Sequence, residues 1–297
     1  MSPRLSADHY VTAQDGLRLH LVEYGERTAP GLPVVCLPGL ARTAVDFTEL
    51  AAVLADDPDR RRRVLALDYR GRGLSDHDRD PANYAIPVEL GDVLAVLTAR
   101  AVERAVVVGT SRGGLIAMAL GAVRPAIIAG VVLNDIGPVI EPQGLMRIKG
   151  YVGKLPQPRN LEDGADMLRR LFGGQFPKLG DADWLSWARK TWREHDGRLV
   201  ATYDPQLSRA LATIDPEHPL PPMWEQFDAL TGIPLMVIRG ANSDLLSTAT
   251  LEAMKARRND MTVLEIPDQG HAPLLAEPDT IARITAFVRD CEDRARA

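Results

Sequence analysis

Cysteine is scarce in this sequence: the 297 residues include only Cys36 and Cys291. Two cysteines cannot form a disulfide framework, and by themselves they cannot complete a four-ligand zinc site. Cys36 also lies inside the apolar run 34–37, where we expect a buried and unreactive thiol. Cysteine chemistry is therefore not expected to carry the function.

An excess of positive charge is also missing, because 35 Lys and Arg residues face 40 Asp and Glu residues, for a net charge of −5. A dedicated nucleic-acid-binding protein usually carries a basic footprint, so nucleic acid is not an expected partner. The first ten residues contain no apolar core of a secretory signal, and Arg124 and Pro125 interrupt the apolar stretch 115–133. We therefore expect a cytoplasmic protein without a membrane span.

What the sequence does contain is an alternation of short apolar runs with segments of helical period, in the overall composition of a globular protein. Strands are predicted at 17–24, 33–37, 64–67, 105–108, 127–133, 234–238 and 262–266. Helices are predicted at about 43–55, 88–101, 115–123, 247–257 and 278–289. Strands that alternate with helices require crossover connections, so the prediction is an α/β fold with a mostly parallel sheet.

This rhythm stops between residues 137 and 231, where no strand pattern is visible. We interpret the segment as a helical cap inserted before the strand at 234–238, with residues 1–136 and 232–297 forming the core. All four tryptophans of the chain fall in the insertion. Trp184, Trp187, Trp192 and Trp224 are candidates to line a substrate pocket, although each could equally bury the core of the cap.

The sharpest motif is the G-x-S-x-G pentapeptide at 109–113, which lies between a predicted buried strand and a predicted helix. In such a tight turn the flanking glycines allow a strained backbone that lifts the serine hydroxyl above the edge of the sheet. The helix behind it presents unpaired N–H groups and the positive end of its dipole. Ser111 is therefore the candidate nucleophile.

A serine hydroxyl needs a base that removes its proton, and that base needs a carboxylate that fixes its tautomer. His271 is the candidate base because it follows the last predicted strand, at the same sheet edge as Ser111. We favour Asp244 as the carboxylate, since it follows the strand after the insertion and gives the chain order Ser, Asp, His. Asp135, which follows the preceding strand, is the alternative.

Two backbone N–H groups are predicted to stabilise an oxyanion. One belongs to Arg112, the residue after the serine, and the other to Leu40, in the loop after the strand at 33–37. The charged glycine turn at 68–76 is interpreted as a loop held by arginine–carboxylate pairs in preference to a substrate-binding element. Neither G-x-x-x-x-G-K-[ST] nor G-x-G-x-x-G occurs, so no phosphate-cradling loop is predicted.

Together these segments resemble the α/β-hydrolase family over nearly the whole chain. The matching pieces are 37–40, 68–76, 109–113, 239–244 and 270–271. The resemblance extends to capped bacterial members such as 3-oxoadipate enol-lactonases, carboxylesterases, meta-cleavage-product hydrolases and cofactor-free haloperoxidase-like enzymes. Many of these relatives have His-Gly where this chain has Pro38-Gly39. Haloalkane dehalogenases and epoxide hydrolases use an aspartate nucleophile, so a serine at position 111 argues against both activities.

The expected function is that of a serine hydrolase that cleaves a small-molecule carboxylic ester or lactone through an acyl-enzyme, without a metal or organic cofactor. The enzymatic alternatives are C–C bond hydrolysis of meta-cleavage products and haloperoxidase-like perhydrolysis. A third alternative is a non-catalytic ligand receptor on the same scaffold, which would commonly lack one of the three residues of the triad. The sequence specifies neither the natural substrate nor the oligomeric state.

Overall fold

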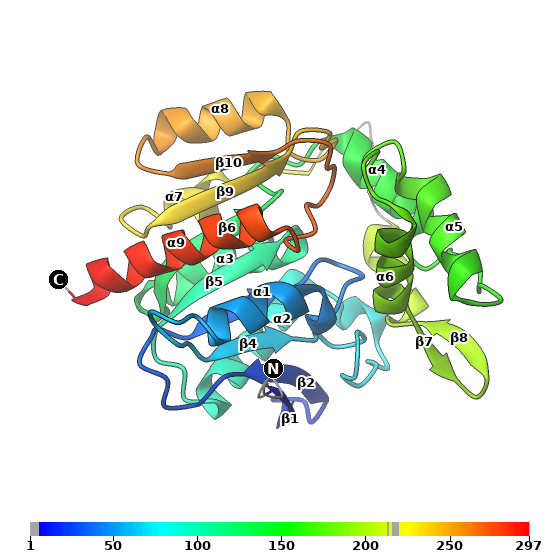
Figure 1. Cartoon of the computed structure of the whole chain (residues 1–297), viewed down its shortest axis with the longest axis horizontal. Helices are drawn as coiled ribbons and strands as arrows, with labels where there is room; N and C mark the ends of the chain where they lie inside the picture. Colours follow the sequence, from blue (N-terminus) through cyan, green and yellow to red (C-terminus); the bar gives the residue numbers. More distant parts are fainter. Residues whose placement is uncertain (1–5, 213, 216–219, 297) are drawn as a thin grey trace.

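A sheet of eight strands lies between two layers of helices in the computed structural model, which describes residues 6–212, 214–215 and 220–296 (Figure 1). The strand order is β1-β2-β4-β3-β5-β6-β9-β10. β2 is antiparallel to both of its neighbours, and all other neighbouring pairs are parallel. The strands are β1 (Ser6–Thr12), β2 (Arg18–Tyr24), β3 (Val34–Leu37), β4 (Val64–Leu67), β5 (Ala105–Thr110), β6 (Ile128–Asn134), β9 (Leu235–Gly240) and β10 (Thr262–Ile266). The predicted α/β fold with a mostly parallel sheet is confirmed.

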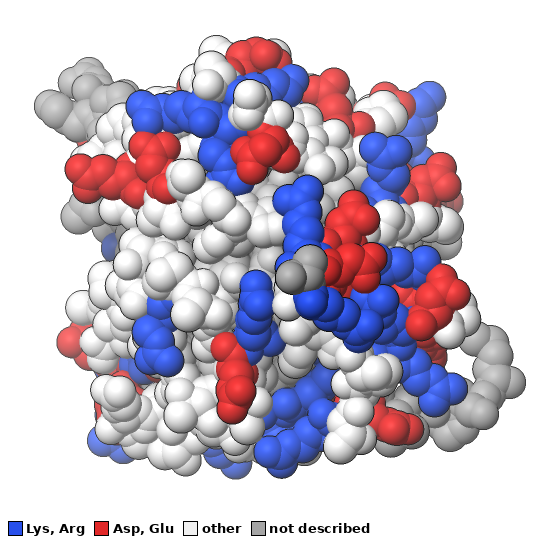
Figure 2. All heavy atoms as spheres, turned by 90° about the vertical axis from the view of Figure 1, so that its left-hand side faces the viewer, with Lys and Arg blue, Asp and Glu red and all other residues white. Residues whose placement is uncertain are grey.

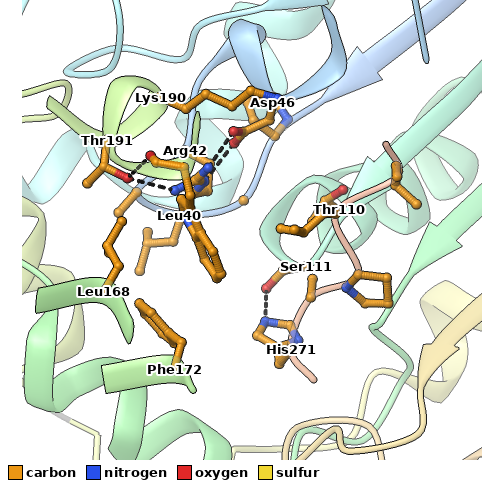
Figure 3. A pocket seen from close by; sticks show the side chains of 18 of the residues that line it. Leu40, Arg42, Asp46, Thr110, Ser111, Leu168, Phe172, Lys190, Thr191 and His271 are labelled. Atoms are coloured by element: carbon orange, nitrogen blue, oxygen red, sulfur yellow. Dashed lines mark hydrogen bonds and ion pairs between the residues drawn. The ribbon is translucent and has the colours of Figure 1, made fainter. Parts of the chain in front are cut away.

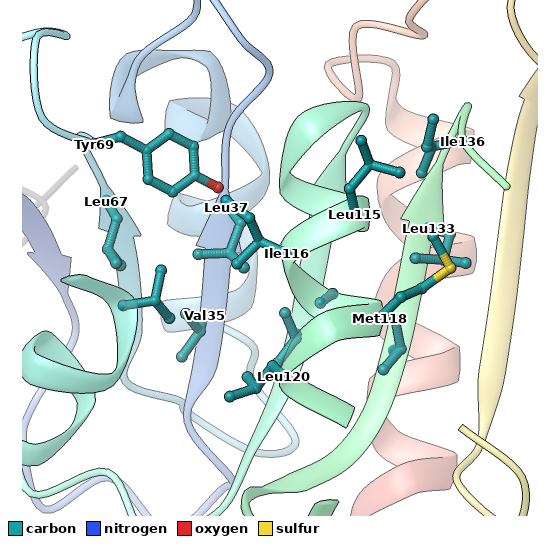
Figure 4. Packing of buried hydrophobic residues seen from close by; sticks show 14 of the residues in the cluster. Val35, Leu37, Leu67, Tyr69, Leu115, Ile116, Met118, Leu120, Leu133 and Ile136 are labelled. Atoms are coloured by element: carbon teal, nitrogen blue, oxygen red, sulfur yellow. The ribbon is translucent and has the colours of Figure 1, made fainter. Parts of the chain in front are cut away.

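The central strands are short and apolar because both of their faces are covered. Every residue of β3, β4 and β6 is buried, as expected for parallel strands between two helical layers. On one face, Leu115, Ile116 and Met118 of helix α3 (Arg112–Val123) pack against side chains of β3, β4 and β6 (Figure 4). Cys36 belongs to the opposite face, where complete burial raises the pKa of its thiol.

The helices divide between the two faces according to the two buried clusters. Helices α1 (Thr48–Ala55) and α9 (Pro278–Arg296) cover one face. Helices α2 (Ile86–Ala99), α3 (Arg112–Val123), α7 (Trp224–Asp228) and α8 (Thr248–Arg257) cover the other. Short 3₁₀ helices occur at Ala44–Phe47, Pro81–Asn83, Pro125–Ile127 and Pro205–Leu211. Among the described residues, no helix is long and apolar enough to cross a membrane.

The insertion forms a separate layer at the end of the sheet where the parallel strands terminate (Figure 1). Its helices are α4 (Pro142–Tyr151), α5 (Leu161–Phe172) and α6 (Asp181–Thr191), and its hairpin consists of β7 (Trp192–His195) and β8 (Arg198–Ala201). The prediction that this segment contains no strand is wrong. Asp196-Gly197, both with positive φ, form the two-residue turn that joins these strands.

The end of the insertion belongs to the core layer and not to the cap. Phe227 of α7 and the following Leu230 are fully buried, α7 contacts α3, and the side chain of Leu230 lies against Gly121 of α3. The prediction of a cap that extends to residue 231 therefore places its boundary too late. Tertiary packing against α3 decides this boundary, and a five-residue helix carries no sequence signal for it.

Basic and acidic side chains are interspersed on the face of the molecule remote from the cap (Figure 2). One group of charged side chains lies in the interior. Arg62, just before β4, is fully buried; its Nε donates to Glu292 of α9 at 2.8 Å and its Nη1 to Asp57 at 2.5 Å. This ion-pair network fastens the C-terminal helix to the segment between α1 and β4. The neighbouring Asp293 is 65% exposed and pairs with Arg60.

We predict that Glu292→Gln lowers the free energy of unfolding by about 3 kcal/mol, because it removes the carboxylate that accepts two bonds from a buried guanidinium. The neighbouring Asp293→Asn serves as the matched control, and its exposed pair contributes at most about 1 kcal/mol. Urea denaturation of both variants measures the difference. Equal decreases in the free energy of unfolding for the two variants would show that the buried Arg62 network stabilises the fold no more than the exposed pair does.

Candidate active site

Ser111 lies in the sharp turn between β5 and α3, with φ +50° and ψ −112°. A positive φ is strained for a residue other than glycine and persists only where surrounding packing enforces it. A Cβ on Gly109 would lie 2.5 Å from the backbone of Gly113, and a Cβ on Gly113 would lie 2.0 Å from the carbonyl oxygen of Leu37. Both glycines of the motif are therefore required for the close packing that holds the turn.

His271 lies on the loop after β10, and its Nε2 is 2.8 Å from Ser111 Oγ (Figure 3). The imidazole is buried, with 8% of the residue exposed. Asn134, at the end of β6, helps to fix this loop because its side-chain amide donates to the carbonyl oxygen of Pro273 at 2.9 Å. The structure thus brings the predicted nucleophile and base into hydrogen-bond contact.

The carboxylate that reaches His271 is that of Asp135. Its Oδ2 lies 2.8 Å from His271 Nδ1 and also accepts the hydroxyl of Ser243 at 2.6 Å, while its Oδ1 accepts the Gly240 N–H at 2.8 Å. Asp135 is fully buried and directly follows β6, the strand beside β5. With Nδ1 protonated toward this carboxylate, Nε2 is free to accept the proton of Ser111.

The prediction that Asp244 contacts His271 is wrong. Asp244 lies four residues beyond the end of β9 and accepts two hydrogen bonds from Arg147 of cap helix α4, at 2.6 and 2.9 Å. Burial alone would raise the pKa of Asp244, but the Arg147 guanidinium lowers it below its usual value. The strand order explains the difference, because β6 adjoins β5 whereas β9 lies one strand farther away. The sequence signal for Asp135 was its position just after the apolar run 127–133.

The two residues predicted to supply N–H donors, Arg112 and Leu40, belong to segments that adjoin Ser111. Arg112 is the first residue of α3, and the first N–H groups of a helix have no acceptor within it. Leu40 lines the same cavity as Ser111, and a Cβ on its neighbour Gly39 would lie 3.9 Å from Ser111 Cβ. The loop at 37–40 therefore approaches the serine closely from β3.

A cavity of about 260 Å³ opens between Ser111 and the cap. Aromatic and aliphatic side chains of the cap, including Ile148, Tyr151 and Phe172, form much of its wall. Figure 3 shows a polar end away from Ser111, where Arg42 binds Asp46 and Lys190 lies nearby. Lys190 in turn bonds both carboxylate oxygens of Glu49 at 2.9 Å. The cations that line the cavity are thus already paired with carboxylates.

Only one of the four tryptophans lines this cavity, namely Trp187. Trp184 stacks behind it with ring centroids 5.4 Å apart, and Trp192 is buried in the same cap cluster. Trp224 packs edge to face on Phe227 in the core. The expectation of a pocket role is therefore wrong for Trp184, Trp192 and Trp224: the first two are buried inside the cap, and Trp224 is a half-buried ring packed against the core.

No group of three or more His, Cys, Asp or Glu side chains is arranged to hold a metal ion within the described part of the chain. The reactive feature is the hydrogen-bonded series Ser111, His271 and Asp135, open to a cavity on the serine side. Such a series can transfer the serine proton to the imidazole as the hydroxyl attacks an electrophilic carbon.

We predict that Asp135→Asn slows the labelling of Ser111 by a small fluorophosphonate by about 10³- to 10⁴-fold, because an amide favours the wrong imidazole tautomer. Asp244→Asn is the matched control and should stay close to the wild-type rate, since Asp244 bonds Arg147 and not His271. Intact-protein mass spectrometry over time measures both rates, with thermal unfolding as the check on folding. If Asp244→Asn slows labelling strongly and Asp135→Asn does not, Asp244 is the carboxylate that supports His271.

Comparison with known proteins agrees with this geometry. The model of the alpha/beta hydrolase family matches residues 34–284. The chain is 32% identical to a 3-hydroxybutyrate-oligomer hydrolase of Cupriavidus necator, over 96% of this chain and 98% of that protein. It is 24% identical to a 2-(acetamidomethylene)succinate hydrolase of Mesorhizobium japonicum, over 97% and 99% of the two chains. The crystal structure of an alpha/beta hydrolase from Novosphingobium aromaticivorans superposes with a TM-score of 0.89, at 40% identity and coverage of 97% and 99%. The chain belongs to the alpha/beta hydrolase family.

Proposed function

We propose that this protein is a serine hydrolase that cleaves carboxylic esters or lactones through a covalent acyl-enzyme. The observation that carries the proposal is the uninterrupted series of short contacts from Ser111 Oγ to His271 and on to the buried Asp135. A serine with that support, in the wall of a largely apolar cavity, is the arrangement that acyl transfer requires.

The mechanism follows from the positions of the three side chains. Ser111 Oγ attacks the ester carbonyl carbon while its proton passes to His271 Nε2, and the N–H groups of Leu40 and Arg112 donate hydrogen bonds to the resulting oxyanion. As the tetrahedral intermediate collapses, the C–O bond to the leaving alcohol breaks and His271 gives that oxygen its proton. Water then attacks the acyl-enzyme with His271 as base, and Ser111 leaves with its proton restored. Asp135 stabilises the imidazolium at both stages.

Within this class, we propose short oligoesters of hydroxy acids as the substrate. The relative that covers nearly all of the chain at 32% identity is named for 3-hydroxybutyrate oligomers. The cavity supports a chain of alternating ester groups and small alkyl groups, because apolar cap residues and hydroxyl donors such as Tyr203 both line it. A chain that enters there would place one of its ester carbonyls at Ser111.

The charges of the cavity favour such a chain over a small dicarboxylate like the one in the name of the Mesorhizobium relative. Its two cations, Arg42 and Lys190, are held by Asp46 and Glu49, and Asp183 adds another negative charge to the lining. A dianionic substrate would have to displace these carboxylates. Neutral ester units meet no such cost.

We predict that Ser111→Ala abolishes hydrolysis of p-nitrophenyl butyrate and of 3-hydroxybutyrate dimers and trimers, with a loss of about 10⁴-fold or more. The hydroxyl removed is the only atom that can form the acyl bond in the proposed mechanism. Product acid is measured by chromatography, with circular dichroism to confirm folding. Substantial residual turnover in a clean preparation would contradict the assignment of the nucleophile.

Two of the tryptophans, one in the cavity wall and one against the core, provide a separate test of specificity. Trp187→Leu should change the relative kcat/KM for ester chains of different length by about 1–3 kcal/mol, because this ring forms part of the cavity wall. Trp224→Leu makes the same substitution in the core and should leave the profile unchanged. If neither variant changes the dependence of kcat/KM on chain length, the determinants of specificity lie elsewhere, and the loop around Leu40 is the next candidate.

A further inference from the structure

A buried ion-pair network connects the two residues that supply the proposed oxyanion donors. At its centre is Glu89 of α2, which is fully buried. Its Oε2 accepts Arg112 Nε at 2.5 Å, and its Oε1 lies 2.7 Å from Arg72 Nη1. Arg72 is also fully buried and belongs to the charged glycine turn after β4. One carboxylate therefore joins two guanidinium groups from different elements.

The second arginine reaches the oxyanion loop directly. Arg72 Nε donates to the carbonyl oxygen of Leu40 at 2.8 Å, and its Nη1 donates to the carbonyl oxygen of Arg70 at 2.6 Å. The carbonyl and the N–H of Leu40 belong to adjoining peptide planes that meet at its Cα, so an anchored carbonyl leaves only the φ and ψ of Leu40 to set the direction of that N–H. Arg112, the other partner of Glu89, carries the second N–H on its own backbone.

We infer that Glu89 and Arg72 are positioning residues that set the distance between the Leu40 and Arg112 N–H groups, and so the geometry of the oxyanion hole. This inference rests on the proposed function. Neither side chain lines the cavity, so both act through the backbone that they hold. Displacement of a donor by about 1 Å can cost a catalytic site 10²-fold in rate, which is the size of effect that such a network can control.

The burial of these charges points to the same role. Complete burial lowers the pKa of Arg72, which reflects the cost of placing a guanidinium in the interior. Apolar side chains of similar volume often stabilise a protein as well as a buried ion pair does, so stability alone is a weak reason to keep one here. The network also touches the cap, because Arg72 forms a backbone bridge with Tyr203, which lines the cavity.

The chain contains a matched control for this network. Glu23 of β2 is also buried, and its carboxylate accepts Arg63 Nε at 2.7 Å and Nη2 at 2.9 Å. A further arginine, Arg100, bonds the same carboxylate at 2.7 Å. Glu23 thus joins two guanidinium groups as Glu89 does, but its partners contact neither Leu40 nor Ser111.

The experiment compares Glu89→Gln with Glu23→Gln in the full-length protein. For Glu89→Gln we expect kcat on p-nitrophenyl butyrate to fall by about 10- to 100-fold, with KM nearly unchanged. A trifluoromethyl ketone, whose adduct with Ser111 carries an oxyanion, should lose affinity by a similar factor. Glu23→Gln should lower thermal stability but leave kcat and ketone affinity at the wild-type level.

Equal kinetic behaviour of the two variants, with stability lost in both, would overturn the inference. If Glu89→Gln does not fold, Arg112→Met removes one arm of the network on a partly exposed side chain, and it should show the same parallel loss of kcat and ketone affinity. The wild-type protein separates the two proposals. A wild type that neither hydrolyses esters nor binds the ketone contradicts the proposed function itself, whereas an active wild type with an unaffected Glu89→Gln contradicts only the positioning role.

Discussion

The buried carboxylate of Asp135 is the constraint on which the rest of the site depends. It directly follows β6, is fully buried, and accepts hydrogen bonds from the Gly240 N–H, the Ser243 hydroxyl and His271 Nδ1. A charge in that position is stable only when donors surround it. The donors come from the last residue of β9, the loop after it and the loop after β10, so satisfying Asp135 also fixes the loop that carries the histidine. Ser111, one strand away, then meets the free ring nitrogen.

The sequence predicts the parts of this site that depend on local patterns. The succession of a strand, the G-x-S-x-G motif and a helix is enough to predict Ser111 as the nucleophile. The glycines of the motif are needed for a turn that depends on local sequence. His271 follows from its place after the last strand. Pocket roles for Trp184, Trp192 and Trp224 could not be settled in this way, since helical spacing does not say which face of the cap meets the sheet.

The choice between Asp135 and Asp244 needed knowledge of the sheet that the sequence does not contain. Asp135 and Asp244 each follow a parallel strand at the same edge of the sheet, so the local sequence pattern does not distinguish them. The structure separates them through strand order and through Arg147, whose cap helix docks where it can bond Asp244. The Arg147–Asp244 ion pair joins the cap to the core. Asp244, the acid that the sequence favours, therefore pairs with an arginine and not with His271.

The central claim is that Ser111 forms an acyl bond with the substrate, and trapping that intermediate tests it most directly. Full-length protein is mixed with p-nitrophenyl butyrate, quenched with acid within milliseconds, digested and analysed by mass spectrometry. We expect a butyryl group on the peptide that contains Ser111, at an occupancy that rises and decays with turnover. Turnover without any such adduct, or an adduct on another residue, would contradict it.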